Sequence, residues 1–320
     1  MRKVLSLSKK TIPLALGIFF IYLTYLNTTA EDRENIIKYI QNANYRFVFL
    51  SVFFGILSHI SRAVRWQYLL LPLGYHPKAM NSILAVLIGY LSNLGIPRSG
   101  ELLRASVMDR YESIPFQKGF GTIIAERLVD LIILFTFLLV ALGLQYDLIA
   151  DYLSLKDLNL FYALLSLTLL IIILIVLRKF FRYSTHPITV KIKKIFQGLW
   201  EGMVSIKHMK NKVLFVAHTI FIWFMYLLMF WIIKFSIPET INLGISAMIA
   251  AFVVGGFSIS ATNGGVGIYP YTVSMVLIAF GISKESSLAF GWIIWTCQTL
   301  MVVTFGAISF FALPLVNRQK

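Results

Sequence analysis

The sequence predicts an all-α polytopic membrane protein with about six full spans and two re-entrant segments broken by Gly and Pro, arranged as an inverted repeat. Of its 320 residues, 58% are hydrophobic and 13% are charged, and the mean hydropathy is +0.79. A soluble domain has about 45–50% apolar and about 25% charged residues. Several apolar runs reach the roughly 20 residues that cross a bilayer. We therefore expect residues 1–320 to form a single membrane domain.

The predicted full spans are continuous apolar runs. Residues 1–30 also have the basic start and apolar middle of a cleaved signal peptide, and this alternative stays open. We favour a retained first span because it completes the repeat described below. Two further apolar segments, 79–95 and 243–281, are interrupted by Gly, Asn and Pro, and two full spans are an alternative for 243–281 that the charge distribution leaves open. The full spans are expected at 11–27, 47–70, 118–144, 158–177, 212–234 and 287–312.

The protein has a net charge of +15, and its basic residues are distributed unequally between the two predicted sides of the membrane. With the N-terminus inside, the inner loops hold 22 of the 29 Lys and Arg residues and the outer loops hold six. Basic residues stay on the cytoplasmic side of membrane proteins. We therefore expect a multi-pass protein of the cell inner (plasma) membrane with both termini cytoplasmic. This distribution explains the basic excess without nucleic-acid binding.

The longest predicted inner loop contains an amphipathic segment over 188–212. Its apolar residues recur at helical spacing and lysines fill the gaps. Such a helix lies on an anionic membrane surface, so the inner leaflet is an expected partner. A plain linker between two spans is compatible with the same pattern.

The two halves of the chain, 1–157 and 158–320, show the same order of predicted elements. In each half, two spans precede a broken segment and a further span. The breaks read "SNLGIP" at 92–97 and "TNGGVGIYP" at 262–270, which share Asn, Gly, Ile and Pro in order. One half starts inside and the other outside, which predicts an inverted repeat. Paired interrupted segments of this kind indicate the substrate site of a transporter.

The first break provides flexible backbone and charge together. Pro97 cannot donate a hydrogen bond, and Gly95 and Gly100 relax the backbone. Irregular backbone cannot face lipid, so we expect a re-entrant hairpin that lines a wet cavity. The alternative is a cytoplasmic loop whose charges are solvated.

A new helix is expected just after this break, capped by Ser99 or Gly100 and starting at Glu101. Free N–H groups at a helix N-terminus favour an anion. Arg98 and Arg104 would lie beside it, and arginine binds phosphate through two parallel hydrogen bonds. Together with Asn93, these residues predict a site for a lipid phosphate.

Ionisable residues also occur inside two predicted spans. Glu126, Arg127 and Asp130 lie in "AERLVD", where Glu126 and Asp130 share a helix face. Such groups are costly in a membrane and are functional candidates, although an Arg127–Asp130 pair that only fixes packing is the alternative. In the second span, Arg62 is a candidate for the cavity, and Arg65 is expected to extend to the inner interface.

The second break carries no charge, and its polar candidates are Asn263 and Tyr269. The histidines have no partner at ligand spacing, so we infer no metal site. The sequence contains no nucleotide-binding fingerprint and no nucleophile–base set, so we expect neither a cofactor nor an enzyme. The backbone breaks here are Gly264, Gly265, Gly267 and Pro270.

The ordered motifs "NLGIPRSGELLRA", "AERLVDL" and "TNGGVGIYP" resemble the flippase-like family of the lysylphosphatidylglycerol synthase transmembrane region. The resemblance covers nearly the whole chain and implies a membrane-embedded lipid translocase with re-entrant helices. Family motifs fall on Gly100, Glu101 and Arg104, on Glu126, Arg127 and Asp130, and on Gly264, Gly265 and Gly267. Two-domain synthases continue into an aminoacyl-transfer domain, so that activity is not implied for a chain ending at Lys320.

Two functions remain open from the sequence. The first is translocation of an anionic or aminoacylated phospholipid, or of a polyprenyl-phosphate lipid, between leaflets. The second is a non-transporting membrane partner that recruits or regulates a lipid-modifying enzyme. Charge that lines a cavity between two halves favours the first, and charge confined to an exposed loop favours the second.

Overall fold

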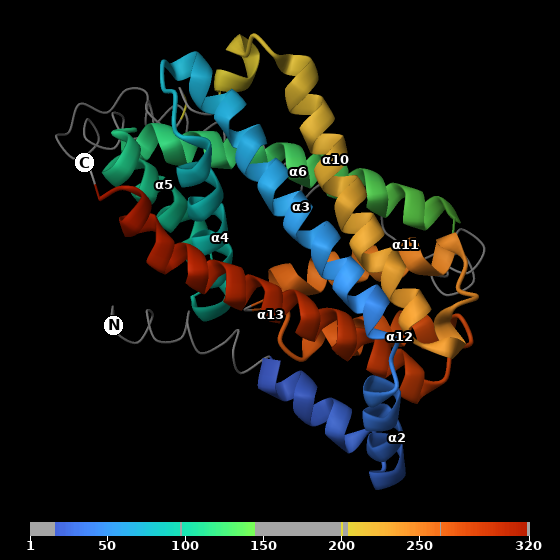
Figure 1. Ribbon diagram of the computed structural model, residues 1–320. Helices are drawn as coiled ribbons and strands as arrows, with labels where there is room; N and C mark the ends of the chain where they lie inside the picture. Colours follow the sequence, from blue (N-terminus) through green and yellow to red (C-terminus); the bar gives the residue numbers. More distant parts are fainter. Residues whose placement is uncertain (1–16, 97, 145–199, 201–203, 263, 319–320) are drawn as a thin grey trace, which may run out of the picture.

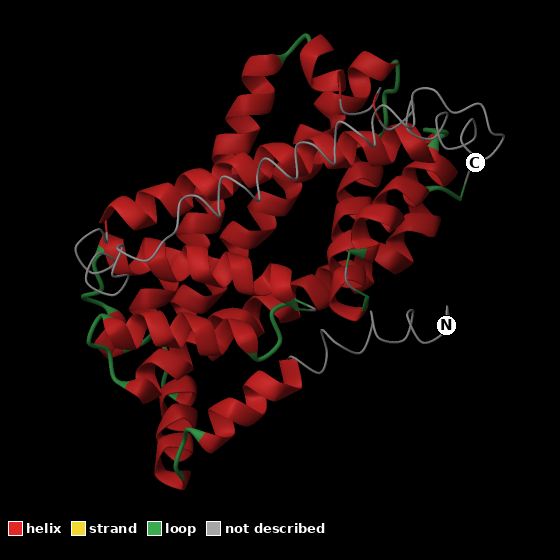
Figure 2. Cartoon of the chain, turned by 180° about the vertical axis from the view of Figure 1, so that it is seen from behind, coloured by secondary structure: helices red, strands yellow, loops and turns green. Residues whose placement is uncertain are grey.

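The structure is a computed structural model that describes residues 17–96, 98–144, 200, 204–262 and 264–318 (Figure 1). Throughout these residues the regular elements are helices joined by short loops, as Figure 2 shows from behind. A first helix covers Gly17–Leu26. The other α-helices are α2 (Ala30–Gln41), α3 (Tyr45–Leu70), α4 (Ala79–Gly95), α5 (Ser99–Glu112), α6 (Phe116–Leu144), α10 (Lys212–Ile232), α11 (Ile245–Ala261), α12 (Ile268–Ala279) and α13 (Lys284–Val316). Short 3-10 helices follow α3 at Leu71–Leu73 and α10 at Ile233–Ser236 and Pro238–Thr240, and the first two of these continue the long helices.

Four helices in the described part of the chain are long and apolar enough to cross a membrane. They contain the predicted spans 47–70, 118–144, 212–234 and 287–312, which are thereby confirmed as long apolar helices. Gly17–Leu26 lies within the predicted span 11–27, whereas 158–177 and most of 188–212 fall outside the described residues. The four helices extend over Tyr45–Leu73, Phe116–Leu144, Lys212–Ser236 and Lys284–Val316.

Both broken segments fold as helical hairpins. In the first, α4 ends at Gly95 and Ile96 is extended, as expected for the residue before a proline. In the second, α11 and α12 are joined through Gly264, Gly265 and Gly267, with φ of 63°, 76° and 69°. Left-handed backbone of this kind favours glycine, which explains the glycines of the second break.

The two hairpins are embedded in the same way between the long helices. The arm α4 packs on α13 while α5 packs on α6. Reciprocally, α11 packs on α6 while α12 packs on α13. The long helices α3 and α10, each preceding a hairpin, lie side by side (Figure 1). The inverted repeat stays a prediction, and this reciprocal packing supports it.

The ends of the two hairpins touch. A Cβ added at Gly264 would lie 2.5 Å from Cδ2 of Leu94, so the leucine side chain rests directly on the glycine. On the other side, the indole nitrogen of Trp295 in α13 donates to the Gly264 carbonyl at 2.8 Å. The second hairpin end is therefore held between the first hairpin and α13.

The segment predicted as the first outer loop contains α2, which begins with a capping box between Thr29 and Asp32. Lys284, at the start of α13, pairs with Asp32 at 2.8 Å. Nearby, the hydroxyls of Ser283 and Ser286 each donate to the Glu239 carboxylate at 2.6 Å, which lowers the pKa of that carboxyl group. The Lys284–Asp32 pair ties α2 to the beginning of α13, and the Glu239 contacts tie the segment before α11 to the same end of α13.

The arms of the first hairpin cross backbone to backbone. A Cβ added at Gly100 would collide with the carbonyl oxygen of Gly89, so this crossing requires glycine at position 100. A Cβ at Gly89 would meet Cγ of Arg104 at 2.9 Å. The two glycines thus bring α4 and α5 together and leave room for the arginine side chain.

We predict that Gly100→Ala destabilises the protein by about 1–3 kcal/mol, because overpacking forces the hairpin arms apart. Gly95→Ala is the matched control, since a Cβ there meets nothing within 4 Å. Unfolding midpoints in detergent measure both variants. Equal midpoints for the two variants would show that the glycine crossing is not required.

Candidate functional site

A buried cluster of charged side chains joins α3, α5 and α6. Glu126 is fully buried, and its Oε1 accepts from Nη1 of Arg62 and Nη2 of Arg65, both at 2.9 Å. Its Oε2 accepts from Nη2 of Arg104 at 3.0 Å. Asp130 accepts from Nη1 of Arg62 and, at 2.9 Å, from Nη1 of Arg65. One carboxylate therefore links three guanidinium groups on two other helices.

Helical spacing explains most of this cluster. Glu126 and Asp130 are four residues apart and share a face, as predicted. Arg62 and Arg65 are three apart on α3 and face the same two acids. The expectation that Arg65 extends to the membrane interface is wrong: its side chain is fully buried and also donates to the Thr219 hydroxyl at 3.1 Å. Two nearby carboxylates compensate the charge of this arginine in the interior.

Arg127 faces away from that cluster and toward α5. Its Nη2 pairs with Oε1 of Glu101 at 2.9 Å, and its side chain is 39% exposed. The alternative Arg127–Asp130 pair is not formed, because Asp130 is engaged by the arginines of α3. Neighbouring positions on a helix point about 100° apart, which separates Arg127 from Glu126.

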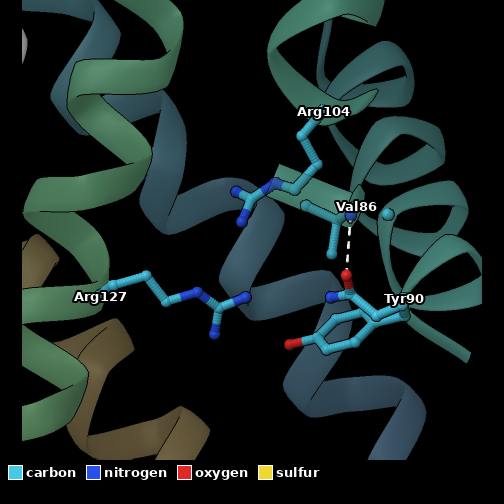
Figure 3. A pocket seen from close by; sticks show the side chains of 7 residues that line it. Val86, Tyr90, Arg104 and Arg127 are labelled. Carbon is cyan, nitrogen blue, oxygen red and sulfur yellow. Dashed lines mark hydrogen bonds between the residues drawn. The ribbon is translucent and has the colours of Figure 1, made fainter. Parts of the chain in front are cut away.

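A narrow crevice lies between Arg104 and Arg127. Their guanidinium groups extend into it from opposite walls, with Tyr90 beneath (Figure 3). Its empty volume is about 170 Å³, less than the roughly 300–1,000 Å³ of typical ligand pockets. The crevice is therefore too small for a typical ligand without movement of its walls. Its lining consists of Val86, Gly89, Tyr90, Asn93, Gly100, Arg104 and Arg127.

Several buried polar atoms around the crevice lack a hydrogen-bond partner among the described residues. Nε of Arg104 and Nε of Arg127 are unused donors, and Oε2 of Glu101 is an unused acceptor. Buried polar groups in native proteins are nearly always paired. Nε of Arg62 and Nε of Arg65 are unused as well, but only Arg104 and Arg127 line the crevice, where their Nε donors are available to an acceptor that enters it.

The start of α5 differs from the prediction. The helix begins at Ser99 rather than Glu101, and Arg98 precedes it in the left-handed conformation with φ of 59°. The Gly100 N–H already donates to Oδ1 of Asn93 at 2.7 Å, as the dashed line in Figure 3 marks. The Asn93 side chain therefore caps the N-terminus of α5, so the Gly100 N–H is not free to bind an anion. Arg98 is exposed and does not line the crevice.

Aromatic residues that the sequence analysis missed surround the arginines. The Arg104 guanidinium lies 4.3 Å from the centre of the Trp66 ring. The Tyr90 and Tyr226 hydroxyls are 3.1 Å apart, and Nη2 of Arg62 donates to Tyr226 at 3.4 Å. Trp66 and Tyr90 lie near the selected residues in the sequence, but no local signal indicates Tyr226, which α10 brings in from far along the chain.

The candidates of the second break lie elsewhere. Tyr269 is buried in a separate apolar cluster and packs against Gly255 of α11. Pro270 packs against Gly291 of α13, and Asn263 and Pro97 lie outside the described residues. The structure therefore places Tyr269 and Pro270 in helix packing rather than in the charged cluster. In the described ranges, no group of three acidic, His or Cys side chains is arranged to hold a metal.

Helices of membrane length around buried charge define a multi-pass membrane protein. The chain belongs to the family of the lysylphosphatidylglycerol synthase transmembrane region, whose model matches residues 11–306. The family membership predicted from the motifs is thereby confirmed.

Relatives extend this assignment to archaeal membrane proteins. The chain is 27% identical to a UPF0104 membrane protein of Methanocaldococcus jannaschii, over 95% of this chain and 86% of that protein. It is 29% identical to a protein named glycosyltransferase AglD from Haloferax volcanii, over 37% of this chain and 18% of the relative. A UPF0104 membrane protein of Pyrococcus horikoshii is 30% identical over 34% of this chain and 33% of that protein. No solved structure matches the chain.

We predict that Glu126→Gln destabilises the protein by about 3–5 kcal/mol, because it leaves buried guanidinium groups without their shared counter-charge. The control is Glu34→Gln, which breaks an exposed pair with Lys38 and should cost about 0.3–0.5 kcal/mol. Chemical denaturation in detergent measures both. A loss below 1 kcal/mol for Glu126→Gln would contradict the central role of this carboxylate.

Proposed function

We propose that the protein is a membrane lipid translocase, and not an enzyme, that moves an anionic or aminoacylated phospholipid, or a polyprenyl-phosphate lipid, between leaflets. The observation that carries this proposal is the crevice between Arg104 and Arg127. Two guanidinium groups face each other there, and each has an unused buried donor. Guanidinium groups bind phosphate oxygens strongly and directionally. A lipid phosphate would supply acceptors for both donors.

The hairpins supply the proposed movement. We take the two halves of the chain as an inverted repeat, supported by the reciprocal packing of the hairpins on α6 and α13. In such transporters one repeat rocks against the other around a fixed site. The contact between Leu94 and Gly264 joins the hairpin ends and would separate or slide as the crevice opens. In this scheme the hairpins must move apart before a headgroup can enter, because the crevice as described is smaller than a typical ligand pocket.

The bilayer position follows from the charge distribution. We place the protein in the cell inner (plasma) membrane with cytoplasmic termini, and we propose that 188–212 rests on the anionic inner leaflet. The α4–α5 hairpin then enters from the cytoplasmic side, and α11–α12 from the outer side. No nucleic acid is involved in this scheme.

We predict that Arg127→Gln slows lipid movement about tenfold or more, because it removes a charge-assisted hydrogen bond worth roughly 1.5–3 kcal/mol. The assay uses purified protein in phosphatidylcholine vesicles with a trace of fluorescent phosphatidylglycerol, and dithionite reports the outer leaflet. Wild-type protein should exchange the lipid faster than empty vesicles.

Lys284→Gln is the matched control for this experiment. Lys284 is 37% exposed and pairs with an acid that is 19% exposed, whereas Arg127 is 39% exposed and pairs with an acid that is 20% exposed. Both variants remove one cation from a peripheral pair, but only Arg127 faces the crevice. Equal rates for the two variants would reject the role of Arg127 in the crevice, and no exchange by wild-type protein would reject translocation of an anionic phospholipid.

We predict that a cysteine at Asn42 is labelled from outside intact cells and that one at Lys210 is labelled only after permeabilisation. The background carries Cys297→Ser, because Cys297 is the single native cysteine. The reason is the concentration of basic residues on the inner side. Labelling of position 210 from outside would invert the proposed topology.

A second function is favoured by one comparison. The match to the protein named glycosyltransferase AglD covers 18% of that protein, so a related membrane segment occurs within a longer chain of that name. The chain would then be a non-transporting partner that recruits or regulates a lipid-modifying enzyme. Lipid binding without exchange between leaflets would favour this function.

A further inference from the structure

We propose that the crevice selects a headgroup with one negative charge, namely a phosphodiester, over a phosphomonoester or a cationic aminoacylated lipid. This inference rests on the proposed function and narrows its substrate class. The charge balance of the buried cluster and the position of its unshared charge carry the argument.

Among the described residues of the cluster and crevice, positive side-chain charges outnumber negative ones. Their ion pairs form two groups in one region across α3, α5 and α6, namely the cluster around Glu126 and the separate Arg127–Glu101 pair. Helices of membrane length surround this region, and bulk water screens such charges poorly. Four guanidinium groups face three carboxylates, which leaves one positive charge. They are Arg62, Arg65, Arg104 and Arg127 against Glu101, Glu126 and Asp130.

The unshared charge is located at Arg104. Arg62 and Arg65 each contact both Glu126 and Asp130, whereas Arg104 contacts only one oxygen of Glu126. Arg127 is balanced by Glu101. Of the three arginines that share the two inner carboxylates, only Arg104 lines the crevice. An anion in the crevice therefore lies beside Arg104, whose charge is compensated by fewer carboxylate contacts than those of Arg62 and Arg65.

Burial makes this arginine an anion site rather than a solvated charge. Arg104 is 3% exposed, its Nε lacks a partner, and its guanidinium is held against Trp66. An uncompensated buried charge is unfavourable, and one added negative charge removes the excess. A dianion would leave the region negative, and a cationic headgroup would increase its positive charge. Both are disfavoured by the same physical effect.

The experiment compares lipids that share acyl chains. At pH 8, phosphatidylmethanol is a monoanionic phosphodiester, phosphatidic acid carries about two negative charges, and lysyl-phosphatidylglycerol is cationic. Binding to the full chain in nanodiscs of phosphatidylcholine is measured by competition with a fluorescent phosphatidylglycerol. We expect phosphatidylmethanol to compete at least tenfold better than either of the others. Phosphatidic acid differs from it by one methyl group and one charge.

Two variants test the charge balance itself. Glu101→Gln leaves Arg127 without its acid and raises the excess by one, so the preference should shift toward phosphatidic acid by about tenfold, a factor that corresponds to about 1.4 kcal/mol. The matched control is Asp32→Asn, which frees Lys284 away from the crevice and should leave the ranking unchanged. Both acids are partly exposed, so neither substitution leaves a fully buried arginine without its counter-charge.

The outcomes separate this inference from the proposed function. Equal or better competition by phosphatidic acid or lysyl-phosphatidylglycerol in wild-type protein overturns the inference, even if lipid exchange between leaflets occurs. The predicted ranking without exchange supports the inference and rejects translocation. Dimethyl phosphate serves as the soluble phosphodiester, and competition by it equal to that of phosphatidylmethanol assigns the site to a free anion instead of a lipid. Failure of all four probes to compete overturns the inference.

Discussion

The carboxylate of Glu126 holds the centre of this protein together. It accepts hydrogen bonds from Arg62, Arg65 and Arg104, and so ties the first hairpin to α3 and α6. An ionised group within a membrane costs roughly 2.5–3.5 kcal/mol on insertion scales, so each of these side chains depends on the others. The cluster consequently specifies one arrangement of three helices, since any shift of α5 would leave a buried charge without its partner.

Two glycines make this arrangement sterically possible. Gly100 lets α5 cross α4 at the Gly89 carbonyl, and Gly89 leaves the space through which the Arg104 side chain passes. A bulkier residue at either position would push the guanidinium away from Glu126 and from the Trp66 ring. The two glycines and the buried charges therefore act together, because close packing of the α4 and α5 backbones places the Arg104 guanidinium at the crevice.

Much of this architecture could be predicted from the sequence, because hydropathy and helical spacing are local. The long helices, the two interrupted segments and the shared face of Glu126 and Asp130 follow from such patterns. Partner choice is not local. Nothing near Arg65 shows that carboxylates of α6 would lie opposite it, so extension to the interface was the reasonable expectation. The same limit applies to Tyr226, and to Asn93, whose amide occupies the N–H of Gly100 that was expected to bind an anion.

The exposure of the Arg127–Glu101 pair suits binding and release. Arg104 is held on one side by Glu126 and Trp66, so we expect it to keep this position when a headgroup binds. Arg127 is partly exposed and has a single acid partner, so a phosphate in the crevice would compete with Glu101 for it. Binding would then exchange one anion for another, which reduces the net desolvation cost compared with a free buried guanidinium. Release would restore the original pair. In the proposed function, Arg104 would keep its partners and provide selectivity, while Arg127 would change partner and allow release.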